Sequence, residues 1–251
     1  VRGAPLRRDG QSSLDAAMTI VPELDNSYLF VQGPPGAGKS HTSAHVIVKL
    51  LQNGKRVGIA SNSHKAVNNL MQKVAKVAQE LGISFHGAKK ANREDEDTWV
   101  NSPMIADVFR NEDISPAHML VGGTAWLFSR EEHDQAFDYL FIDEAGQVAL
   151  ANVIAIGTCA RNIVLVGDQM QLGQPVQGVH PGESGQSVLD YLLQGEPTVR
   201  PEQGLFLGES WRMHPDVCQF ISDVIYGGEL HAHPDCSNQK LVLDQPVPPG
   251  I

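Results

Sequence analysis

The first residues that suggest chemistry are the glycines, the lysine and the serine of Gly33-Pro-Pro-Gly-Ala-Gly-Lys-Ser40. Their spacing is G-x4-G-K-S, and they lie between an apolar run at 28–32 and a segment of helical period at 40–52. In such a loop, glycines let backbone N–H groups face a phosphate, and the dipole of the following helix adds positive charge. Lys39 would reach the β- and γ-phosphates. A tight turn is the alternative, but the complete motif predicts a nucleoside triphosphate site.

Asp143 and Glu144 form a second candidate pair, directly after the apolar run 139–142. A carboxylate at the carboxyl end of a strand, beside a phosphate loop, is where nucleoside triphosphatases hold Mg²⁺. The Ser40 hydroxyl would be the other protein ligand of the metal, and Glu144 would orient and deprotonate the attacking water. An acidic surface turn is the alternative interpretation. We therefore expect ATP and Mg²⁺ as cofactors.

Short apolar runs of high β propensity alternate with longer segments of helical period. Strands are predicted at 28–32, 56–61, 118–122, 139–142, 162–166 and 205–207. An amphipathic helix is predicted from the spacing of Val67, Leu70, Met71, Val74, Ala78 and Leu81. This alternation predicts an α/β fold, a parallel sheet with helices on both faces. Residues 84–116 are weakly patterned and contain the charge cluster 93–97, which favours a surface insertion with a solvated loop.

The composition is typical of a folded protein, with 251 residues of which 41% are hydrophobic and 19% charged. The net charge of −10 excludes a uniformly basic nucleic-acid coat, although a local basic track is compatible with it. No apolar run is long enough to span a bilayer, and no secretory signal opens the sequence, so no membrane partner is expected. Three cysteines without a CxxC pair favour a cytoplasmic, intracellular location. The first residue is Val1 and residues 244–251 resemble a linker, so we expect a fragment.

Later segments narrow the class of nucleotide-binding protein. The segments that resemble motifs II, III and IV of superfamily 1 helicases are Asp143-Glu-Ala-Gly-Gln147, Val166-Gly-Asp-Gln-Met-Gln-Leu-Gly173 and Ser210-Trp-Arg-Met-His-Pro215. Motifs Ia and Ic have similar counterparts in Ala60-Ser-Asn-Ser-His-Lys-Ala-Val67 and Gly122-Gly-Thr-Ala-Trp126. The ordered set is similar to the 5′→3′ branch that contains the nonsense-mediated-decay RNA helicase and the flap-processing nuclease-helicase. It is also similar to bacterial RecB-type nuclease–helicase fusions.

The resemblance implies a P-loop NTPase of RecA-like fold, divided at a boundary near residue 208. Residues 1–208 would form the first RecA-like motor domain, and residues 209–251 the motif IV segment and the beginning of an incomplete second domain. The family's motifs V and VI have no counterpart before Ile251. The expected partners are therefore the rest of a second RecA-like domain beyond Ile251, a nuclease domain before Val1, and single-stranded DNA or RNA.

The resemblance also implies roles for single residues. Gln171 would sense the γ-phosphate and Arg212 would act as an arginine finger, which completes a catalytic set with Lys39 and Glu144. Gln11 would read the adenine and Trp211 would stack on it. The residues expected to hold the nucleotide are Gln11, Gly33, Pro34, Pro35, Gly36, Ala37, Gly38, Lys39, Ser40, His41 and Trp211. Ordinary structural roles are the alternatives: a surface turn, a salt bridge, core packing or a flexible terminus.

Contacts to nucleic acid are expected from polar residues that follow two strands. Ser61, Asn62 and Ser63 in motif Ia, with Thr124 in motif Ic, offer hydroxyl and amide groups to a phosphate backbone. Ser and Asn after a strand are also common helix N-caps, which is the alternative. The first functional hypothesis is thus an ATP-hydrolysing helicase motor in DNA repair or nucleic-acid processing, poorly active as a lone fragment. A P-loop enzyme of another class, such as a small-molecule kinase, and an ATP-binding module not coupled to nucleic acid are the alternatives.

Overall fold

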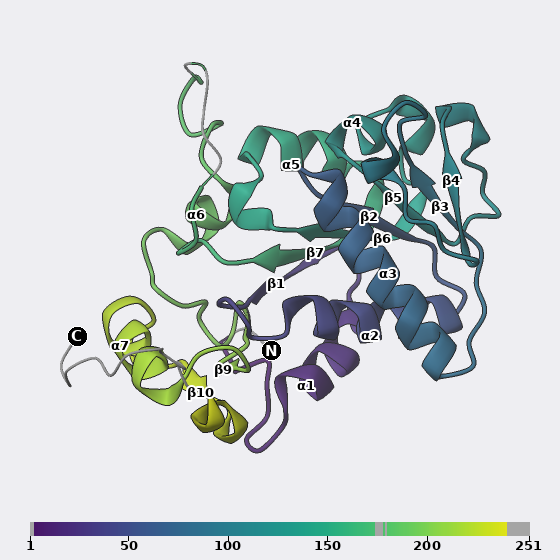
Figure 1. Ribbon diagram of the computed structural model, residues 1–251. Helices are drawn as coiled ribbons and strands as arrows, with labels where there is room; N and C mark the ends of the chain where they lie inside the picture. Colours follow the sequence, from purple (N-terminus) through teal and green to yellow (C-terminus); the bar gives the residue numbers. More distant parts are fainter. Residues whose placement is uncertain (1–2, 174–177, 179, 240–251) are drawn as a thin grey trace, which may run out of the picture.

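The computed structural model describes residues 3–173, 178 and 180–239 (Figure 1). Within this part of the chain, eight parallel strands form one sheet in the order β4-β3-β5-β2-β6-β7-β1-β8. The strands are β1 (Tyr28–Gln32), β2 (Val57–Ala60), β3 (Gly87–Lys90), β4 (Ile105–Val108), β5 (Leu120–Gly123), β6 (Phe137–Asp143), β7 (Ala160–Gly167) and β8 (Gly204–Phe206). The parallel sheet predicted from the alternation is confirmed.

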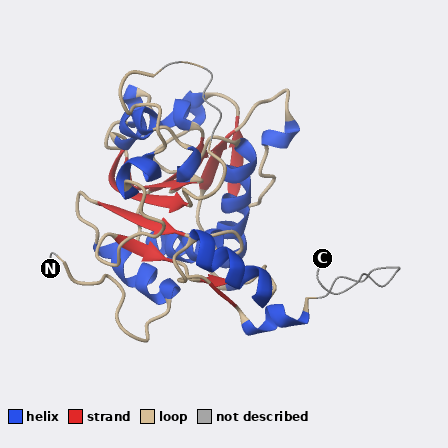
Figure 2. Cartoon of the chain, turned by 90° about the vertical axis from the view of Figure 1, so that its left-hand side faces the viewer, coloured by secondary structure: helices blue, strands red, loops and turns tan. Residues whose placement is uncertain are grey.

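Two groups of helices cover the two faces of this sheet. Figure 2 shows the strands in red between helices in blue. The α-helices are α1 (Ser13–Ile20), α2 (Lys39–Gln52), α3 (His64–Glu80), α4 (Ala125–Phe128), α5 (Leu150–Gly157), α6 (Val188–Leu193) and α7 (Pro215–Ile225). Short 3-10 helices lie at η1 (Val21–Glu23), η2 (Glu96–Thr98), η3 (Asn111–Asp113), η4 (Glu131–His133), η5 (Ala145–Gln147) and η6 (Pro234–Asn238).

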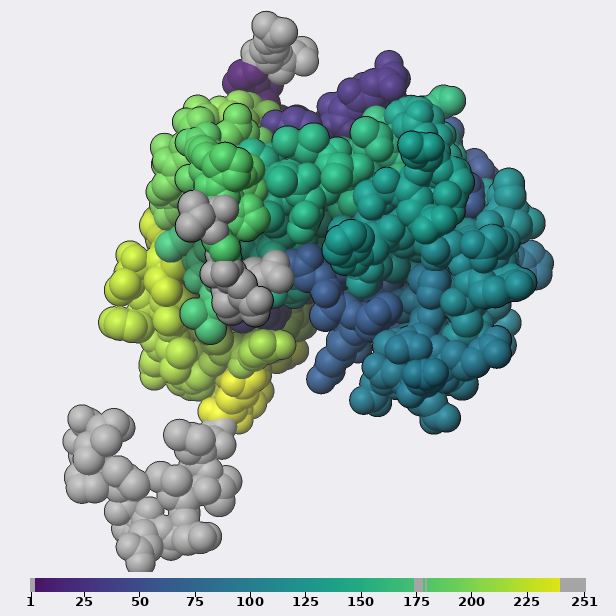
Figure 3. Space-filling model, turned by 90° about the horizontal axis from the view of Figure 1, so that it is seen from above, coloured from purple at the N-terminus to yellow at the C-terminus, as the bar shows by residue number. Residues whose placement is uncertain are grey.

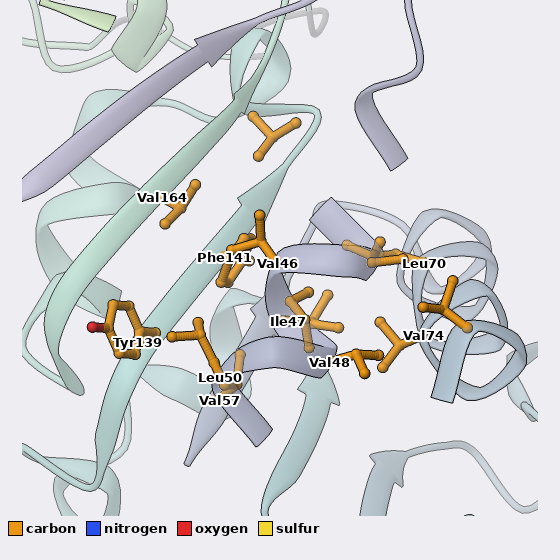
Figure 4. Packing of buried hydrophobic residues seen from close by; sticks show 14 of the residues in the cluster. Val46, Ile47, Val48, Leu50, Val57, Leu70, Val74, Tyr139, Phe141 and Val164 are labelled. Atoms are coloured by element: carbon orange, nitrogen blue, oxygen red, sulfur yellow. The ribbon is translucent and has the colours of Figure 1, made fainter. Parts of the chain in front are cut away.

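The two-residue period of the strands divides the apolar side chains between two cores. From β6, Tyr139 and Phe141 point into the core beneath α1, α2 and α3, while Leu140 and Ile142 point into the core beneath α4, α5 and α6. Figure 4 shows the first core, where Ile47 of α2 lies among side chains of α3 and the sheet. Because both faces are covered, the strands are apolar on both sides, as parallel sheets require.

The prediction of a surface insertion with a solvated loop at 84–116 is wrong in part. Strands β3 and β4 extend the sheet at the edge of β5, and Lys89 on β3 is fully buried. The charge cluster 93–97 is exposed, as expected of a solvated segment. β3 reads Gly-Ala-Lys-Lys, which has no β-branched or aromatic residue, so its sequence carries no strand signal. Pairing with the neighbouring backbone decides its conformation.

The last described segment packs beside β1 and β8 (Figure 1). It contains α7 and a two-stranded parallel sheet of β9 (Glu209–Ser210) and β10 (His231–Ala232). Its own small core consists of Cys218, Tyr226 and Leu230. The expected linker at 244–251 lies outside the described residues.

Candidate functional site: a phosphate loop with docked motif segments

The phosphate loop joins β1 to α2 and has the backbone that its glycines predict. Gly36 and Gly38 adopt left-handed conformations, with φ of 80° and 84°. The Lys39 ammonium donates to the Gly33 carbonyl at 2.6 Å, so the lysine lies over the loop. A Cβ on Gly33 would lie 2.5 Å from Lys39 Cγ, which leaves glycine as the only residue that fits without a shift. The loop therefore presents one ammonium and its backbone N–H groups to the same space.

Asp143 ends β6 two strands away from the loop, because β7 lies between β6 and β1. Its side chain is only 6% exposed. Burial, together with the neighbouring Glu144 carboxylate, raises the pKa of Asp143 to about 6, although the Lys39 ammonium opposes this change. Glu144 adopts φ of 54°, and its backbone N–H donates to Asp143 Oδ1 at 3.1 Å. The left-handed backbone at Glu144 thus begins a turn directly after the strand.

A magnesium ion fits this arrangement of donors. A buried carboxylate with a raised pKa is stabilised by a cation, and Mg²⁺ prefers oxygen ligands and keeps several waters. Asp143 and the hydroxyl of Ser40, in the first turn of α2, are the oxygen donors that would hold it. The ion would supply positive charge between the phosphates of a nucleotide and the carboxyl end of β6.

The loops after β6 and β7 touch each other closely. Asp168, 3% exposed, accepts hydrogen bonds from Gln171 Nε2 at 3.3 Å and from Tyr226 Oη at 2.7 Å. A Cβ on Gly146 would lie 2.6 Å from the Asp168 carbonyl oxygen, so motif II approaches motif III through a glycine. Gln171, the predicted sensor, is therefore oriented by Asp168, to which the sequence analysis assigned no role.

Gln32 is a second residue that the sequence analysis missed. It ends β1 immediately before the loop and is fully buried. Its Oε1 accepts from Val199 N–H at 2.6 Å, and its Nε2 donates to Gln169 Oε1 and to the Pro197 carbonyl, both at 3.0 Å. These bonds join the phosphate loop strand to motif III and to the segment before β8. A polar residue at the end of an apolar strand was the available signal.

The motif IV segment lies directly against the tip of the phosphate loop. The Trp211 N–H donates to the Gly36 carbonyl at 3.0 Å, and a Cβ on Gly36 would lie 2.4 Å from Arg212 Cβ. Ser210 is fully buried, and its Oγ accepts from the N–H groups of Arg212 and Met213 at 3.3 and 3.4 Å. The side chain of Arg212 is exposed. The backbone and Cβ of Arg212, the predicted arginine finger, thus lie against the phosphate loop.

A cavity of about 990 Å³ lies beside the loop and is lined in part by Gly36, Ala37, Gly38, His41 and Trp211. The Trp211 ring is 56% exposed and stacks on His233, with 3.5 Å between ring centroids and 18° between planes. Burial lowers the pKa of His41. This space has the size and the apolar lining that a nucleoside needs.

The structure places Gln11 differently from the other predicted nucleotide-binding residues. Its Oε1 accepts from the Arg8 N–H at 3.2 Å, and the cavity wall is formed instead by Ser12 and Ser13, next along the chain. Gln11 therefore closes a turn beside the cavity, whereas the alternative considered for this residue was a flexible N-terminal stretch.

The predicted nucleic-acid residues meet at one edge of the sheet. Adjacent strands β2 and β5 end at Ala60 and Gly123, so Ser61 and Thr124 follow side by side. Figure 3 shows the blue segment after β2 between green and teal parts of the surface. Ser61 is 3% exposed. The edge therefore brings motifs Ia and Ic together.

Two of these side chains also have structural partners. Ser63 Oγ accepts from Ala66 N–H at 3.1 Å and so caps α3. Asn62 Nδ2 donates to the carbonyl of Gln147 in motif II at 2.5 Å. Motif Ia is thereby tied to the nucleotide site.

Comparisons with known proteins identify the family of the chain. A family model described as an AAA domain matches residues 14–187, more than half of the chain. The chain belongs to this family. The AAA domain shares 28% identity over 221 residues, 86% of the chain, with the DNA replication ATP-dependent helicase/nuclease dna2 of Schizosaccharomyces pombe. It also shares 27% identity with the regulator of nonsense transcripts 1 homolog of Drosophila melanogaster, in an alignment of 266 residues that covers 90% of this chain.

These relatives confirm the resemblance to the superfamily 1 branch named from the motifs. The AAA domain spans 15% of the length of the first relative and 22% of the second. A solved complex of an Arterivirus helicase, nonstructural protein 10, with DNA superposes with a TM-score of 0.52 at 15% identity, over 89% of this chain and 44% of that one. The fold is thus that of a RecA-like P-loop NTPase. None of the described helices is long and apolar enough to cross a membrane.

Proposed function

We propose that the chain is the first ATP-hydrolysing motor domain of a nucleic-acid helicase. One observation carries the proposal: motif IV, about 170 residues after the phosphate loop in sequence, packs on Gly36 through the Trp211 N–H. A nucleotide-binding module that only held phosphate would need the loop alone. Here the Lys39 ammonium of the loop is near enough to Asp143 to affect its pKa, and the backbone of the exposed Arg212 packs on Gly36.

Each side chain of the site has a role that its position supports. Lys39 would neutralise charge on the β- and γ-phosphates, and Ser40 and Asp143 would hold Mg²⁺. Glu144 would take a proton from the attacking water at its carboxylate. Arg212 would reach the γ-phosphate from the opposite side. The exposed face of Trp211 would stack on the adenine.

The proposal extends to partners of the domain. Asn62, Ser63 and Thr124 would contact the backbone of single-stranded DNA or RNA, because the strands that precede them end at one edge. The hydroxyl of Ser61 was expected to do the same, but Ser61 is 3% exposed, so we leave it out of this contact. The chain spans 15% of the length of a relative named as a helicase/nuclease, so we propose that a second RecA-like domain follows residue 251 and that a nuclease domain precedes residue 1. We propose that the first domain ends at residue 208. We also propose that the protein is cytoplasmic.

The test is phosphate release by the longer protein that contains this chain, measured without polynucleotide, with single-stranded DNA and with single-stranded RNA. We expect stimulation by one polymer and loss of turnover in Lys39→Ala. Lys76→Ala is the matched control, since Lys76 is exposed and pairs only with Glu80 at 3.9 Å among described residues. Hydrolysis equal in all three conditions would favour a P-loop ATPase not coupled to nucleic acid.

A further inference from the structure

A buried hydrogen bond joins two segments that lie 58 residues apart. Tyr226 Oη donates to Asp168 Oδ2 at 2.7 Å, and the two side chains are 3% exposed each. Burial and the adjacent Asp168 carboxylate raise the pKa of Tyr226, so the phenol keeps its proton and remains a donor. Hydrogen bonds to a buried charged acceptor are among the stronger ones in proteins.

Asp168 uses its two oxygens for different partners. Oδ2 accepts from Tyr226 and, at 3.3 Å, from Gln171 Nε2, while Oδ1 accepts from the Met170 N–H at 3.3 Å. The carboxylate is therefore the centre of the motif III loop, and its position decides where the Gln171 amide points. Gln171 is the residue assigned to the γ-phosphate in the proposed function.

Tyr226 belongs to the segment that also contains Arg212. It follows the last turn of α7, and its N–H donates to the Ser222 carbonyl at 2.9 Å. Its ring packs in the small core with Cys218 and Leu230, and its centroid lies 6.1 Å from that of Phe206. A shift of α7 must therefore move the phenol or break its bond to Asp168.

We propose that Tyr226 is a positioning residue for ATP hydrolysis. Its hydroxyl holds Asp168 so that Gln171 faces the nucleotide, which links the orientation of α7 to the motif III loop. The inference rests on the proposed function, because it takes Gln171 as the residue that acts on the γ-phosphate. It adds a physical connection between the segment that carries Arg212 and the loop that carries Gln171.

A double-mutant cycle in the longer protein tests this link. Tyr226→Phe removes only the hydroxyl, and we expect kcat for polynucleotide-stimulated hydrolysis to fall about tenfold while KM for ATP stays within about twofold. In the Gln171→Ala background the same change should have no further effect, because the group through which Tyr226 acts is gone. Tyr191→Phe is the control, since Tyr191 is 41% exposed on α6. Asp168→Leu has a similar size but no acceptor for the Tyr226 hydroxyl, and it should reproduce the loss in kcat.

The outcomes separate this inference from the proposed function. Equal losses from Tyr226→Phe in the parent and Gln171→Ala backgrounds would show a general packing role and overturn the link. An unchanged kcat in Gln171→Ala would also overturn it, while the lysine variant still decides whether the chain is an ATPase. If Tyr226→Phe fails to fold, an Asp168→Leu variant with parental kcat would refute the inference, because leucine offers no acceptor to the Tyr226 hydroxyl.

Discussion

Lys89 allows a quantitative test of how the edge strands support motif Ia. Its side chain is fully buried on β3, and its Nζ donates to the carbonyls of Lys90 at 2.7 Å and Thr98 at 3.2 Å. Nζ also lies 2.9 Å from Nδ1 of His64, the residue that opens α3 directly after motif Ia residue Ser63. Lys89 therefore links β3 to the first residue of α3.

Burial lowers the pKa of Lys89 from 10.5 to about 8, against the opposing charge of Asp107. Each pKa unit corresponds to about 1.4 kcal/mol, so this change is worth about 3 kcal/mol of folding free energy. Between pH 8 and 10.5 the unfolded chain binds more protons at this site than the folded one, and stability from Lys89 must rise with pH. Below pH 8 Lys89 is protonated in both the folded and the unfolded chain, so this gain in stability is absent.

We expect the variant Lys89→Met to lose this pH dependence. The free energy of unfolding would be measured by urea denaturation from pH 7 to 10.5, and the difference between parent and variant would grow by about 3 kcal/mol in favour of the parent. Lys90→Met is the control, because Lys90 lies next on the same strand but is half-buried, with Nζ bonded to the Ala91 carbonyl. A parent-minus-variant difference that stays constant with pH would refute the reasoning.

Three further substitutions test the site itself. Glu144→Gln should leave ATP affinity unchanged and lower kcat by about 10² to 10⁴, whereas hydrolysis at the parental rate would exclude Glu144 as the base. Gly36→Ala places a Cβ 2.4 Å from Arg212 Cβ at φ of 80° and should lower kcat at least about tenfold by displacing motif IV. The control Gly54→Ala has a similar φ of 71° with no heavy atom within 4 Å, so a similar loss there would point to backbone strain alone. Ser63→Ala removes the cap of α3 and should lower the free energy of unfolding by about 1 kcal/mol in urea denaturation. A stability equal to that of the parent would show that the cap is dispensable.

The nucleotide site was predictable because its chemistry depends on residues that are close in sequence. The loop from Gly33 to Ser40 works through the backbone of consecutive residues, so its spacing alone implies a phosphate cradle. Asp143 and Glu144 were predictable because a carboxylate after an apolar strand has a known place in a parallel sheet. Within the sheet, continuous apolar runs of high β propensity likewise indicated β1, β6 and β7.

Edge strands and polar networks were decided by tertiary structure. β3 has no strand signal and is held by pairing with β5, and the burial of Lys89 follows from that pairing. Ser63 was expected at a phosphate backbone, and the geometry adds its role as an N-cap.

Apolar runs and motif spacing determined the central strands, the phosphate loop and the carboxylates after β6, because each of these leaves a signal in residues that are close along the chain. Only the tertiary structure determined that Arg212 packs on Gly36. The same holds for the hydrogen bonds between Gln32 and Val199 and between Tyr226 and Asp168. The physical reason is that a hydrogen bond between distant residues leaves no periodic pattern in either segment. Its partners become evident only when burial requires each polar group to be satisfied.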